Sequence, residues 1–483
     1  MSFNRIPHII AYSLCFILIW GWGNMAHANT RYVVTPDGDY VTIESALAVA
    51  DAGDTIEVHG GVYSAPLYIE KSVTLLGIEN PVIDGVGTGS LVIITAPDVH
   101  LEGFTIRNSG ISIVTEDTGV VVQASNVRVI NNIVEDVLYG VYFAAADNGI
   151  AQNNTVRCHD LEISRRGDGM RVWYSKNILL DGNTITNCRD TLVWYTDGII
   201  IQNNIIESNL YGLHFMYSDN ATIQNNTIRY NSVGIYMMYS ETITARDNSI
   251  LWNRGASGYG IAFKDSNYIS VENNAVIGNQ SGVYIDNSPM LPDIITLFKG
   301  NFFAYNDVGV SALPAVARNA FQGNAFIDNL QQASTLGRGD LLKNIWQVDG
   351  IGNYWSDYVG YDSDGDGVGD VSYRVEKLFE SLTDEYPLLR LFTYSPASQS
   401  LNFAAVAFPS LRPDPKVIDE APLMHYTVPP HIAQADTTPS MSFLVVSLIL
   451  LGLGGAIFFF TFSPIRLNQT APTSTQNEQG AKS

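Results

Sequence analysis

Apolar and polar residues alternate along the chain in short segments that are rich in β-branched and aromatic side chains. Within the segment Tyr211–Met216, Leu213 and Phe215 fall on one face of an extended chain, and His214 and Met216 fall on the other. The same alternation recurs 22 residues later. Strands repeated at this spacing predict a β-solenoid, in which each coil buries its apolar face by stacking on the next coil.

Two further marks repeat with these segments and indicate where each coil turns. Nine asparagines are each followed by one variable residue and then by an apolar residue. At a bend, an asparagine side chain can bond backbone groups that the bend leaves unpaired. The nine asparagines are Asn132, Asn154, Asn183, Asn204, Asn226, Asn248, Asn274, Asn301 and Asn324. A glycine opens a strand in seven coils, and we expect it to permit a tight entry turn. These glycines are Gly140, Gly169, Gly212, Gly234, Gly260, Gly282 and Gly309.

The pattern predicts one all-β domain of about eleven coils over residues 29–400. Charged residues make up only 15% of the chain, and amphipathic helical patterns are scarce, which also favours strands. One exception is Tyr40–Ala50, where Ile43, Ala46 and Leu47 have helical spacing. We expect this helix to cap the open N-terminal end of the stack.

Both ends of the chain carry apolar runs outside the repeats. Arg5, the run Ile9–Trp20 and the small residues around His27 predict a signal peptide over residues 1–28, and hence export. Residues 401–440 form an extended tail and tether. Residues 441–463 include the 20 uncharged residues Phe443–Phe462 and predict a membrane helix, with residues 464–483 as a cytoplasmic tail. A buried core helix is the alternative for this run.

The charge balance narrows the class of partner. The formal net charge is -22 and the stripe along the repeats lacks a cluster of Lys or Arg, which disfavours binding to the phosphates of a nucleic acid. A metal cation or a basic protein surface suits this charge.

The repeats carry a column of side chains that suits a soft metal. Trp173, Trp194, Met216 and Met238 each precede a Tyr and then a Ser or Thr, at steps of 21 or 22 residues. The Tyr and Ser/Thr columns are interpreted as coil architecture. Met216, Met238, Trp194 and His214 are candidate Cu(I) ligands, because thioether and imidazole groups suit Cu(I) and an indole face can cover a cation. Weaker candidates are Met170 and Met237. The alternative is a packing or partner-facing stripe.

Two other groups carry possible metal or redox chemistry. Cys158 and Cys188 follow corner asparagines of successive coils, which favours a disulfide over copper ligation by thiolates. An acidic loop resembles a calcium loop that lacks its final Glu, because Tyr373 stands at that place. Its candidate ligands are Asp362, Asp364, Asp366, Val368 and Asp370. A solvated turn that closes the solenoid is the alternative.

Several strings together make the chain resemble the NosD family over roughly Tyr32–Met424. They are Arg166–Gly169, Tyr211–Tyr217, Val233–Ser240, Gly258–Gly260 and Asn353–Tyr358. The resemblance implies a right-handed parallel β-helix of the pectin-lyase-like kind, located in the periplasm, and the predicted membrane helix would anchor it in the inner membrane. It also implies a role in assembling the copper centre of nitrous oxide reductase, in which the protein handles copper or a sulfur species. The implied partners are the permease and ATPase subunits of an ABC transporter, nitrous oxide reductase and a copper chaperone lipoprotein. A terminal membrane span departs from the family's soluble form.

Two other functions are compatible with a β-helix. Polysaccharide lyases and hydrolases need clustered carboxylates beside a groove, for which Asp168, Asp190 and Arg171 are the only such set along the repeats. The other compatible function is that of a passive scaffold. The chain has no Walker-type phosphate loop, so any ATP dependence would come from a partner, and we expect this protein not to be an enzyme.

Overall fold

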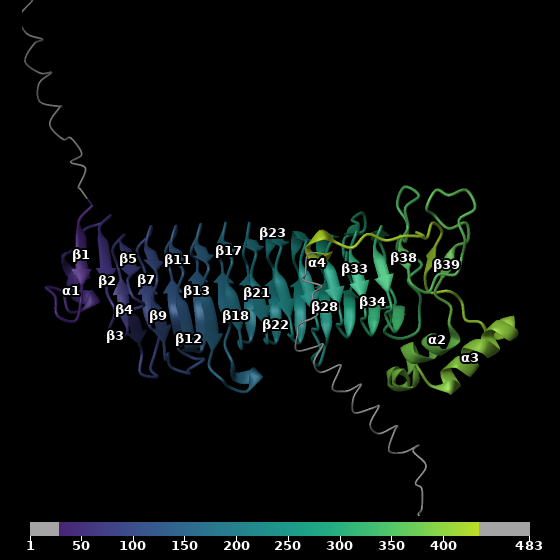
Figure 1. The fold of residues 1–483 in the computed structure, drawn as a ribbon, viewed down its shortest axis with the longest axis horizontal. Coiled ribbons are helices and arrows are strands. Elements are labelled where there is room, and N and C mark those ends of the chain that lie inside the picture. Colours follow the sequence, from purple (N-terminus) through teal and green to yellow (C-terminus); the bar gives the residue numbers. More distant parts are fainter. Residues whose placement is uncertain (1–28, 434–483) are drawn as a thin grey trace, which may run out of the picture. The chain divides into compact units, whose positions relative to one another are not determined.

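The computed structural model describes residues 29–433, which form a right-handed β-solenoid (Figure 1). Each complete coil contributes one strand to each of three parallel sheets, here named A, B and C in the order in which the chain enters them. The sheets contain 13, 13 and 12 strands, so the solenoid has about 13 turns rather than eleven. The parallel β-helix that the resemblance implies is thereby confirmed.

The strands are short, and from β2 to β37 they follow one another through sheets A, B and C in strict rotation. Sheet A contains β1 (Arg31–Val34), β2 (Thr55–Val58), β5 (Thr74–Gly77), β8 (His100–Glu102), β11 (Arg128–Ile130), β14 (Ile150–Gln152), β17 (Leu179–Asp181), β20 (Ile200–Gln202), β23 (Asp219–Gln224), β26 (Glu241–Arg246), β29 (Asn267–Glu272), β32 (Thr296–Lys299) and β35 (Asn319–Gln322). Sheet B contains β3 (Val62–Ser64), β6 (Val82–Asp84), β9 (Thr105–Arg107), β12 (Ile133–Val137), β15 (Thr155–Cys158), β18 (Thr184–Thr186), β21 (Ile205–Glu207), β24 (Thr227–Arg229), β27 (Ser249–Leu251), β30 (Ala275–Ile277), β33 (Phe302–Ala304), β36 (Ala325–Ile327) and β38 (Tyr354–Trp355). Sheet C contains β4 (Leu67–Ile69), β7 (Val92–Ile94), β10 (Thr118–Val122), β13 (Tyr139–Ala144), β16 (Met170–Trp173), β19 (Asp190–Trp194), β22 (Tyr211–Met216), β25 (Val233–Met238), β28 (Tyr259–Lys264), β31 (Ser281–Asp286), β34 (Val308–Ala312) and β37 (Gln331–Thr335).

The remaining elements lie at the ends of the solenoid or in its loops. They are α1 (Ile43–Val49), η1 (Ile163–Arg165), β39 (Tyr373–Arg374), α2 (Leu378–Glu385), η2 (Pro387–Phe392), α3 (Pro396–Ala407), η3 (Pro409–Leu411), β40 (Ile418–Asp419) and α4 (Pro430–Ala433). The last solenoid strand ends at Trp355, so residues 356–400 form helices, loops and the short strand β39 instead of further coils.

Each corner of the coils is held by a ladder of buried polar side chains. At the A–B corner the asparagine side chains bond one another, as with Asn204 Nδ2, which donates to Asn226 Oδ1 at 3.0 Å and to the Leu180 carbonyl at 2.9 Å. The structural role expected of these asparagines is confirmed. A second asparagine ladder occupies the B–C corner, and a Ser/Thr ladder occupies the C–A corner. The second comprises Asn209, Asn231, Asn253, Asn279, Asn306 and Asn329, and the third comprises Ser175, Thr196, Ser218, Ser240, Ser266 and Ser288.

The strand-opening glycines serve close packing rather than the expected turn. None of the seven has a positive φ. A Cβ atom on Gly234 would lie 2.5 Å from the carbonyl oxygen of Gly260 in the next coil, and a Cβ on Gly212 would lie 2.5 Å from that of Gly234. Glycine is therefore needed because the backbones of neighbouring coils approach too closely for any side chain.

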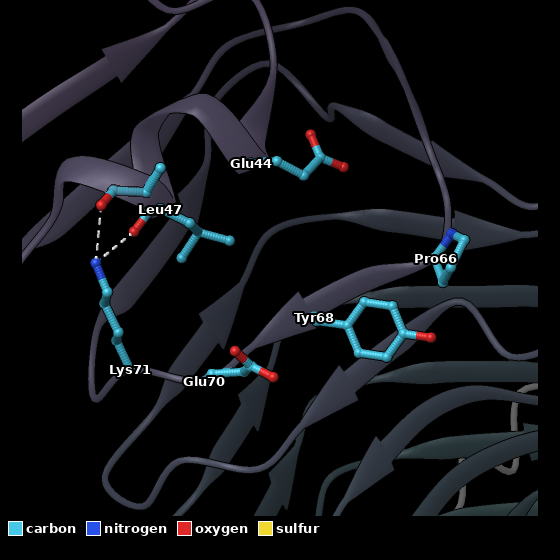
Figure 2. Close-up of a pocket in the computed structure, with 7 residues that line it drawn as sticks. Glu44, Leu47, Pro66, Tyr68, Glu70 and Lys71 are labelled. Carbon is cyan, nitrogen blue, oxygen red and sulfur yellow. Dashed lines mark hydrogen bonds between the residues drawn. The ribbon is translucent and has the colours of Figure 1, made fainter.

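The N-terminal end is closed by α1, as its helical spacing predicts. Ile43, Ala46 and Leu47 are buried against the first coils. Lys71 donates from Nζ to the carbonyl oxygen of Leu47 at 2.9 Å (Figure 2). It also donates to the carbonyl oxygen of Ala50 at 2.7 Å, and these bonds satisfy groups that the helix end leaves free.

The C-terminal end is closed by a buried carboxylate. Asp419 Oδ2 accepts from the backbone N–H of Asn353 at 2.7 Å and from the indole of Trp355 at 3.0 Å. It thus continues the A–B ladder where the next asparagine would stand. Burial raises the pKa of Asp419.

Among residues 29–433, no helix is long and apolar enough to cross a bilayer. The expected signal peptide, the membrane helix over 441–463 and the tail over 464–483 lie outside the described residues.

Candidate functional site

One column of side chains runs along the outward face of sheet C, where strand alternation places it. Cα pairing aligns Trp173 with Trp194, Trp194 with Met216, and Met216 with Met238. All four side chains are half-buried, and the two indole rings lie 4.5 Å apart. We call these four residues the Trp–Met column. Lys264, which sequence reasoning missed, pairs with Met238 and follows the column in the next coil.

His214 stands two residues before Met216 on the same face of β22. Its ring stacks on Tyr211 at 4.6 Å and faces Tyr236 in the next coil at 6.2 Å. Nδ1 lies 3.3 Å from Asp190 Oδ2, so a proton on Nδ1 can be donated to this carboxylate. Nε2 is buried and has no hydrogen-bond partner among the described residues. An orphaned imidazole nitrogen of this kind is suited to accept a metal ion.

The two weaker copper candidates lie inside the solenoid. Met170 and Met237 are fully buried in the apolar core. Met237 pairs with Phe215 and Phe263 of the neighbouring coils, which also point inward. Neither thioether can reach an ion on the outward face.

Trp173 and Trp194 differ in what covers their rings. The guanidinium of Arg171 lies 4.3 Å from the centre of the Trp173 ring and donates to Glu116 at 2.8 Å. Trp173 therefore already binds a cation of its own chain. Trp194 has no such cation among the described residues, and its indole N–H is buried without an acceptor.

A buried cluster of charges lies beside the start of β19. Arg189 donates to Asp168 Oδ1 at 2.8 Å and approaches Asp190 Oδ2 at 3.6 Å, while Arg171 lies 3.8 Å from Asp168. The pKa of Asp168 is raised to about 6, mainly by burial and secondly by the negative charge of Asp190. Sequence reasoning grouped both carboxylates with Arg171 but missed Arg189, which is signalled only by its place before Asp190.

The tyrosines that follow the Trp–Met column form a second column, in which Tyr239 is half-buried and the other three are exposed. Tyr174, Tyr195, Tyr217 and Tyr239 all adopt left-handed backbone angles, with φ between 49° and 53°. Their rings stack at 4.7, 5.2 and 5.0 Å between centroids. This regular stacking fits the architectural role expected of the column, because each ring packs on the next coil.

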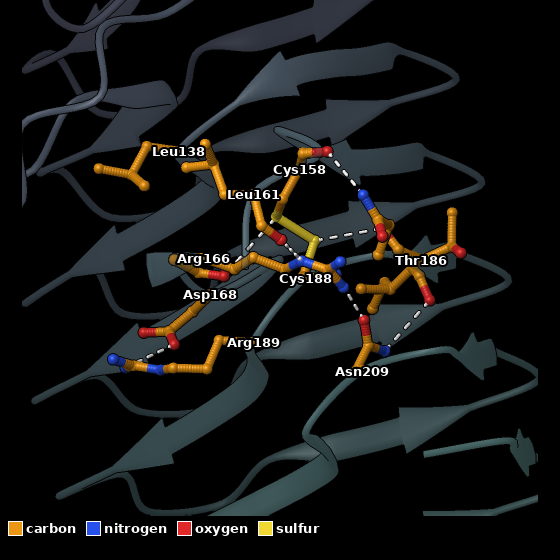
Figure 3. Close-up of a disulfide and its surroundings, with 12 residues drawn as sticks. Leu138, Cys158, Leu161, Arg166, Asp168, Thr186, Cys188, Arg189 and Asn209 are labelled. Atoms are coloured by element: carbon orange, nitrogen blue, oxygen red, sulfur yellow. Dashed lines mark hydrogen bonds and ion pairs between the residues drawn. A yellow bond between two sulfur atoms is a disulfide. The ribbon is translucent and has the colours of Figure 1, made fainter. Parts of the chain in front are cut away.

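Cys158 and Cys188 are joined by a disulfide with a Cα–Cα distance of 5.0 Å (Figure 3). Both are buried in the core next to the Asp168–Arg189 ion pair. A Cβ atom on Gly169 would meet Cys188 Sγ at 2.8 Å, so glycine leaves room for the disulfide. With both sulfurs bonded to each other, neither is a thiolate that could bind copper.

The acidic loop brings together three of its five candidate ligands. Carboxylate oxygens of Asp362, Asp364 and Asp366 lie within 4.8 Å of one another. Asp362 accepts from the backbone N–H groups of Gly365 and Gly367, and the latter bond chiefly lowers its pKa. The other two candidates are placed differently: Asp370 accepts from Ser363, and the backbone N–H of Val368 donates to Asp366. These bonds satisfy much of the loop without an ion.

The fold and this face define a right-handed parallel β-helix protein that presents aromatic, thioether and imidazole groups in register along one sheet. A family model described as periplasmic copper-binding protein (NosD) matches residues 157–360. A probable ABC transporter binding protein NosD of Pseudomonas aeruginosa is 30% identical over 394 residues, which cover 78% of this chain and 89% of that protein. The chain belongs to the NosD family, as its motifs indicate.

Other similarities cover less or show the fold alone. A protein of the same name from Stutzerimonas stutzeri is 35% identical over 131 residues, 27% of this chain and 29% of that protein. The catalytic unit of a thermostable α-1,3-glucanase from Streptomyces thermodiastaticus aligns with a TM-score of 0.55 at 17% identity, and covers 70% of this chain and 71% of that one. This last similarity concerns only the β-helix.

Proposed function

We propose that this protein is a periplasmic accessory protein that receives Cu(I) beside the Trp–Met column and delivers it for assembly of the copper centre of nitrous oxide reductase. Two comparisons support the coarser part of this proposal. The matching family is described as periplasmic and copper-binding, and the curated relatives are named as ABC transporter binding proteins. The residues of this chain supply the argument for copper itself.

His214 carries the proposal. Asp190 holds Nδ1, and the buried Nε2 has no partner among the described residues, which leaves one imidazole lone pair free at the edge of the column. A carboxylate that orients a histidine in this way is the usual outer partner of a metal-bound imidazole.

Met216 and Met238 complete the donor set. They are paired in register on adjacent strands, which stack about 4.8 Å apart. That spacing is about twice a metal–sulfur bond of roughly 2.3 Å, so two stacked thioethers can share one ion. Thioether and imidazole ligands select Cu(I) over harder ions. Trp194 pairs with Met216 from the preceding coil and offers its ring to cover the ion.

Further subunits would act with this chain. It has no phosphate-binding loop, so ATP hydrolysis would belong to the ATPase of an ABC transporter that acts with its permease. A copper chaperone lipoprotein would be the copper donor and nitrous oxide reductase the acceptor. We also propose that residues 1–28 direct export, and that residues 441–463 anchor the chain in the inner membrane.

The carbohydrate-active alternative depends on Asp168 and Asp190. Both carboxylates are almost fully buried, and Arg189 lies against both. A catalytic acid must reach the glycosidic oxygen of a bound sugar, and these groups face arginine instead. Turnover of uronate polymers by the purified protein would favour this alternative over copper delivery.

The test is an anaerobic Cu(I) titration against a competing chelator. In the variant Met216→Leu/Met238→Leu, leucine conserves volume, so the fold persists while both thioethers are lost. We expect Cu(I) affinity to fall by more than about 100-fold, or about 2.7 kcal/mol. Met290→Leu is the matched control, since Met290 is 50% exposed in a loop outside the column. Unchanged stoichiometry and affinity in the double variant would overturn the site.

The delivery step needs a separate measurement in cells. Nitrous oxide reductase purified from cells that carry Met216→Leu/Met238→Leu should contain less copper than reductase from cells that carry Met290→Leu. Equal copper content in both would contradict delivery through the column, even if the purified protein binds Cu(I).

A further inference from the structure

Arg171 covers the first ring of the Trp–Met column with a cation of the chain itself. Its guanidinium lies 4.3 Å from the centre of the Trp173 ring. It also lies 5.5 and 4.8 Å from the ring centres of Tyr139 and Tyr142. Three rings thus surround one cation, as in the aromatic cages that recognise cationic ligands. Only 9% of the Arg171 side chain is exposed, so the cation lies within this cage rather than in solvent.

Two carboxylates hold Arg171 in the cage. Its Nη1 donates to Glu116 at 2.8 Å, and its Nε lies 3.8 Å from Asp168 Oδ2. Because these carboxylates balance the charge of Arg171, its effect on a metal ion comes from covering the ring and not from repulsion at a distance. Since the chain tethers this cation to the ring, it competes with a free ion at a high effective concentration.

The next ring of the column is open to a metal ion. The Trp194 ring lies 4.5 Å from the Trp173 ring, and among the described residues no cation lies over it. Trp194 also pairs in register with Met216. On the same face, Cα pairing places Arg171 two coils before His214 in one column. The face therefore offers a ligand in one coil and a competing cation two coils earlier.

We infer that Arg171 determines where copper binds on this face, because it excludes Cu(I) from Trp173 and leaves Trp194 as the tryptophan of the column that covers the ion. A ring face that is covered by a guanidinium cannot also cover a metal ion. Arg171 thereby limits the column to a single ion, held beside His214. The inference rests on the proposed copper site. Binding by the unaltered chain tests that site, whereas a gain of binding in an Arg171 variant tests the role of Arg171.

Anaerobic Cu(I) titration of Arg171→Met in the full chain measures this gain. The substitution removes the cation and adds a thioether beside Trp173, so we expect the stoichiometry to rise from one Cu(I) per chain to two. Arg171→Lys keeps a cation and should still bind one. Arg229→Met is the matched control and should also bind one. Arg229 pairs with Glu207 at 2.6 Å and lies 5.6 Å from the ring centre of Tyr230, at the end of a strand of sheet B.

Two results of the titration would overturn the inference. One is that Arg171→Met binds no more Cu(I) than the unaltered chain, and the other is that Arg171→Lys or Arg229→Met gains as much. If no chain binds Cu(I), the proposed site fails as well, whereas one ion in every chain refutes only the role of Arg171.

A second measurement leaves Arg171 in place and so does not depend on whether its variants fold. Cu(I) should quench tryptophan fluorescence in Trp173→Phe as it does in the unaltered chain, and should quench it much less in Trp194→Phe. Equal quenching in the two variants, or a greater loss in Trp173→Phe, would show that Arg171 does not keep copper from the first ring.

Discussion

Replacing one asparagine of the A–B ladder should weaken the stacking of the coils that carry the copper candidates. Asn226 lies between Met216 and Met238 in the chain and is 1% exposed. Its Oδ1 accepts from the backbone N–H and the side-chain amide of Asn204, at 2.9 and 3.0 Å. Its Nδ2 donates to the carbonyl of Ile201 and to Asn248 Oδ1, both at 2.9 Å.

The expected magnitude follows from the groups that Asn226→Ala would leave unpaired. The side-chain amide of Asn204 keeps another acceptor, the carbonyl of Leu180. The backbone N–H of Asn204 and the carbonyl of Ile201 lose their bonds to Asn226 in a buried corner. Each such group costs roughly 1–3 kcal/mol, so we expect the free energy of unfolding to fall by about 3 kcal/mol. That is a large fraction of a total of about 5–15 kcal/mol.

Urea unfolding of both proteins measures the loss, and hydrogen exchange locates it. Because a solenoid coil contacts only its neighbours, exchange should rise most in the coils that flank Asn226. Asn225→Gly is the matched control, since Asn225 is exposed and its φ of 56° suits glycine. If Asn226→Ala costs no more than this control, the ladder does not hold the coils together as argued.

Two further predictions concern pH and calcium. Because the folded pKa of Asp168 is raised to about 6 from the ordinary 3.8, the folded protein binds a proton that the unfolded chain has lost. Stability should therefore fall as pH rises from about 4 to about 6, by up to about 3 kcal/mol, and Asp168→Asn should remove this slope in unfolding curves measured across that range. Calcium at 100 times its dissociation constant should stabilise the protein by about 2.7 kcal/mol if the acidic loop binds it, and Asp362→Asn should abolish the gain. A melting temperature indifferent to both calcium and EDTA would contradict the calcium prediction.

The repeat can be recognised in the sequence wherever its corner asparagines are present. Asn132 is the first of them, and its Oδ1 accepts from the backbone N–H of Phe104 in the preceding coil. Phe104 occupies the corner where later coils have asparagine, so the earlier coils lack the mark by which coils can be counted. The estimate of eleven coils was too low for this reason. The second ladder was missed although it has a simple signal, an asparagine five residues after each of the later corner asparagines, as Asn209 follows Asn204.

The outward face was predictable because strand alternation decides it, but contacts between coils were not. Sequence reasoning placed Met216 and Met238 together, and the register agrees. It ranked Met170 as a weaker ligand, although that side chain points into the core. The pairing of Arg189 with Asp168 depends on side-chain directions at the start of two strands, where no periodicity applies.

His214 meets Asp190 only because the ladder between β19 and β22 contains an irregularity. Asp190 pairs with Tyr211, 21 residues later, whereas Leu192 pairs with His214, 22 residues later. Without this shift, Leu192 would pair with Leu213. Since a slip of one residue sends every side chain to the opposite face, the irregularity lets β22 keep Leu213 in the core while His214 faces outward. The Nε2 atom beside the Trp–Met column therefore owes its place to one extra residue in β22. Deletion of this residue should destroy the candidate site and leave the other coils stacked.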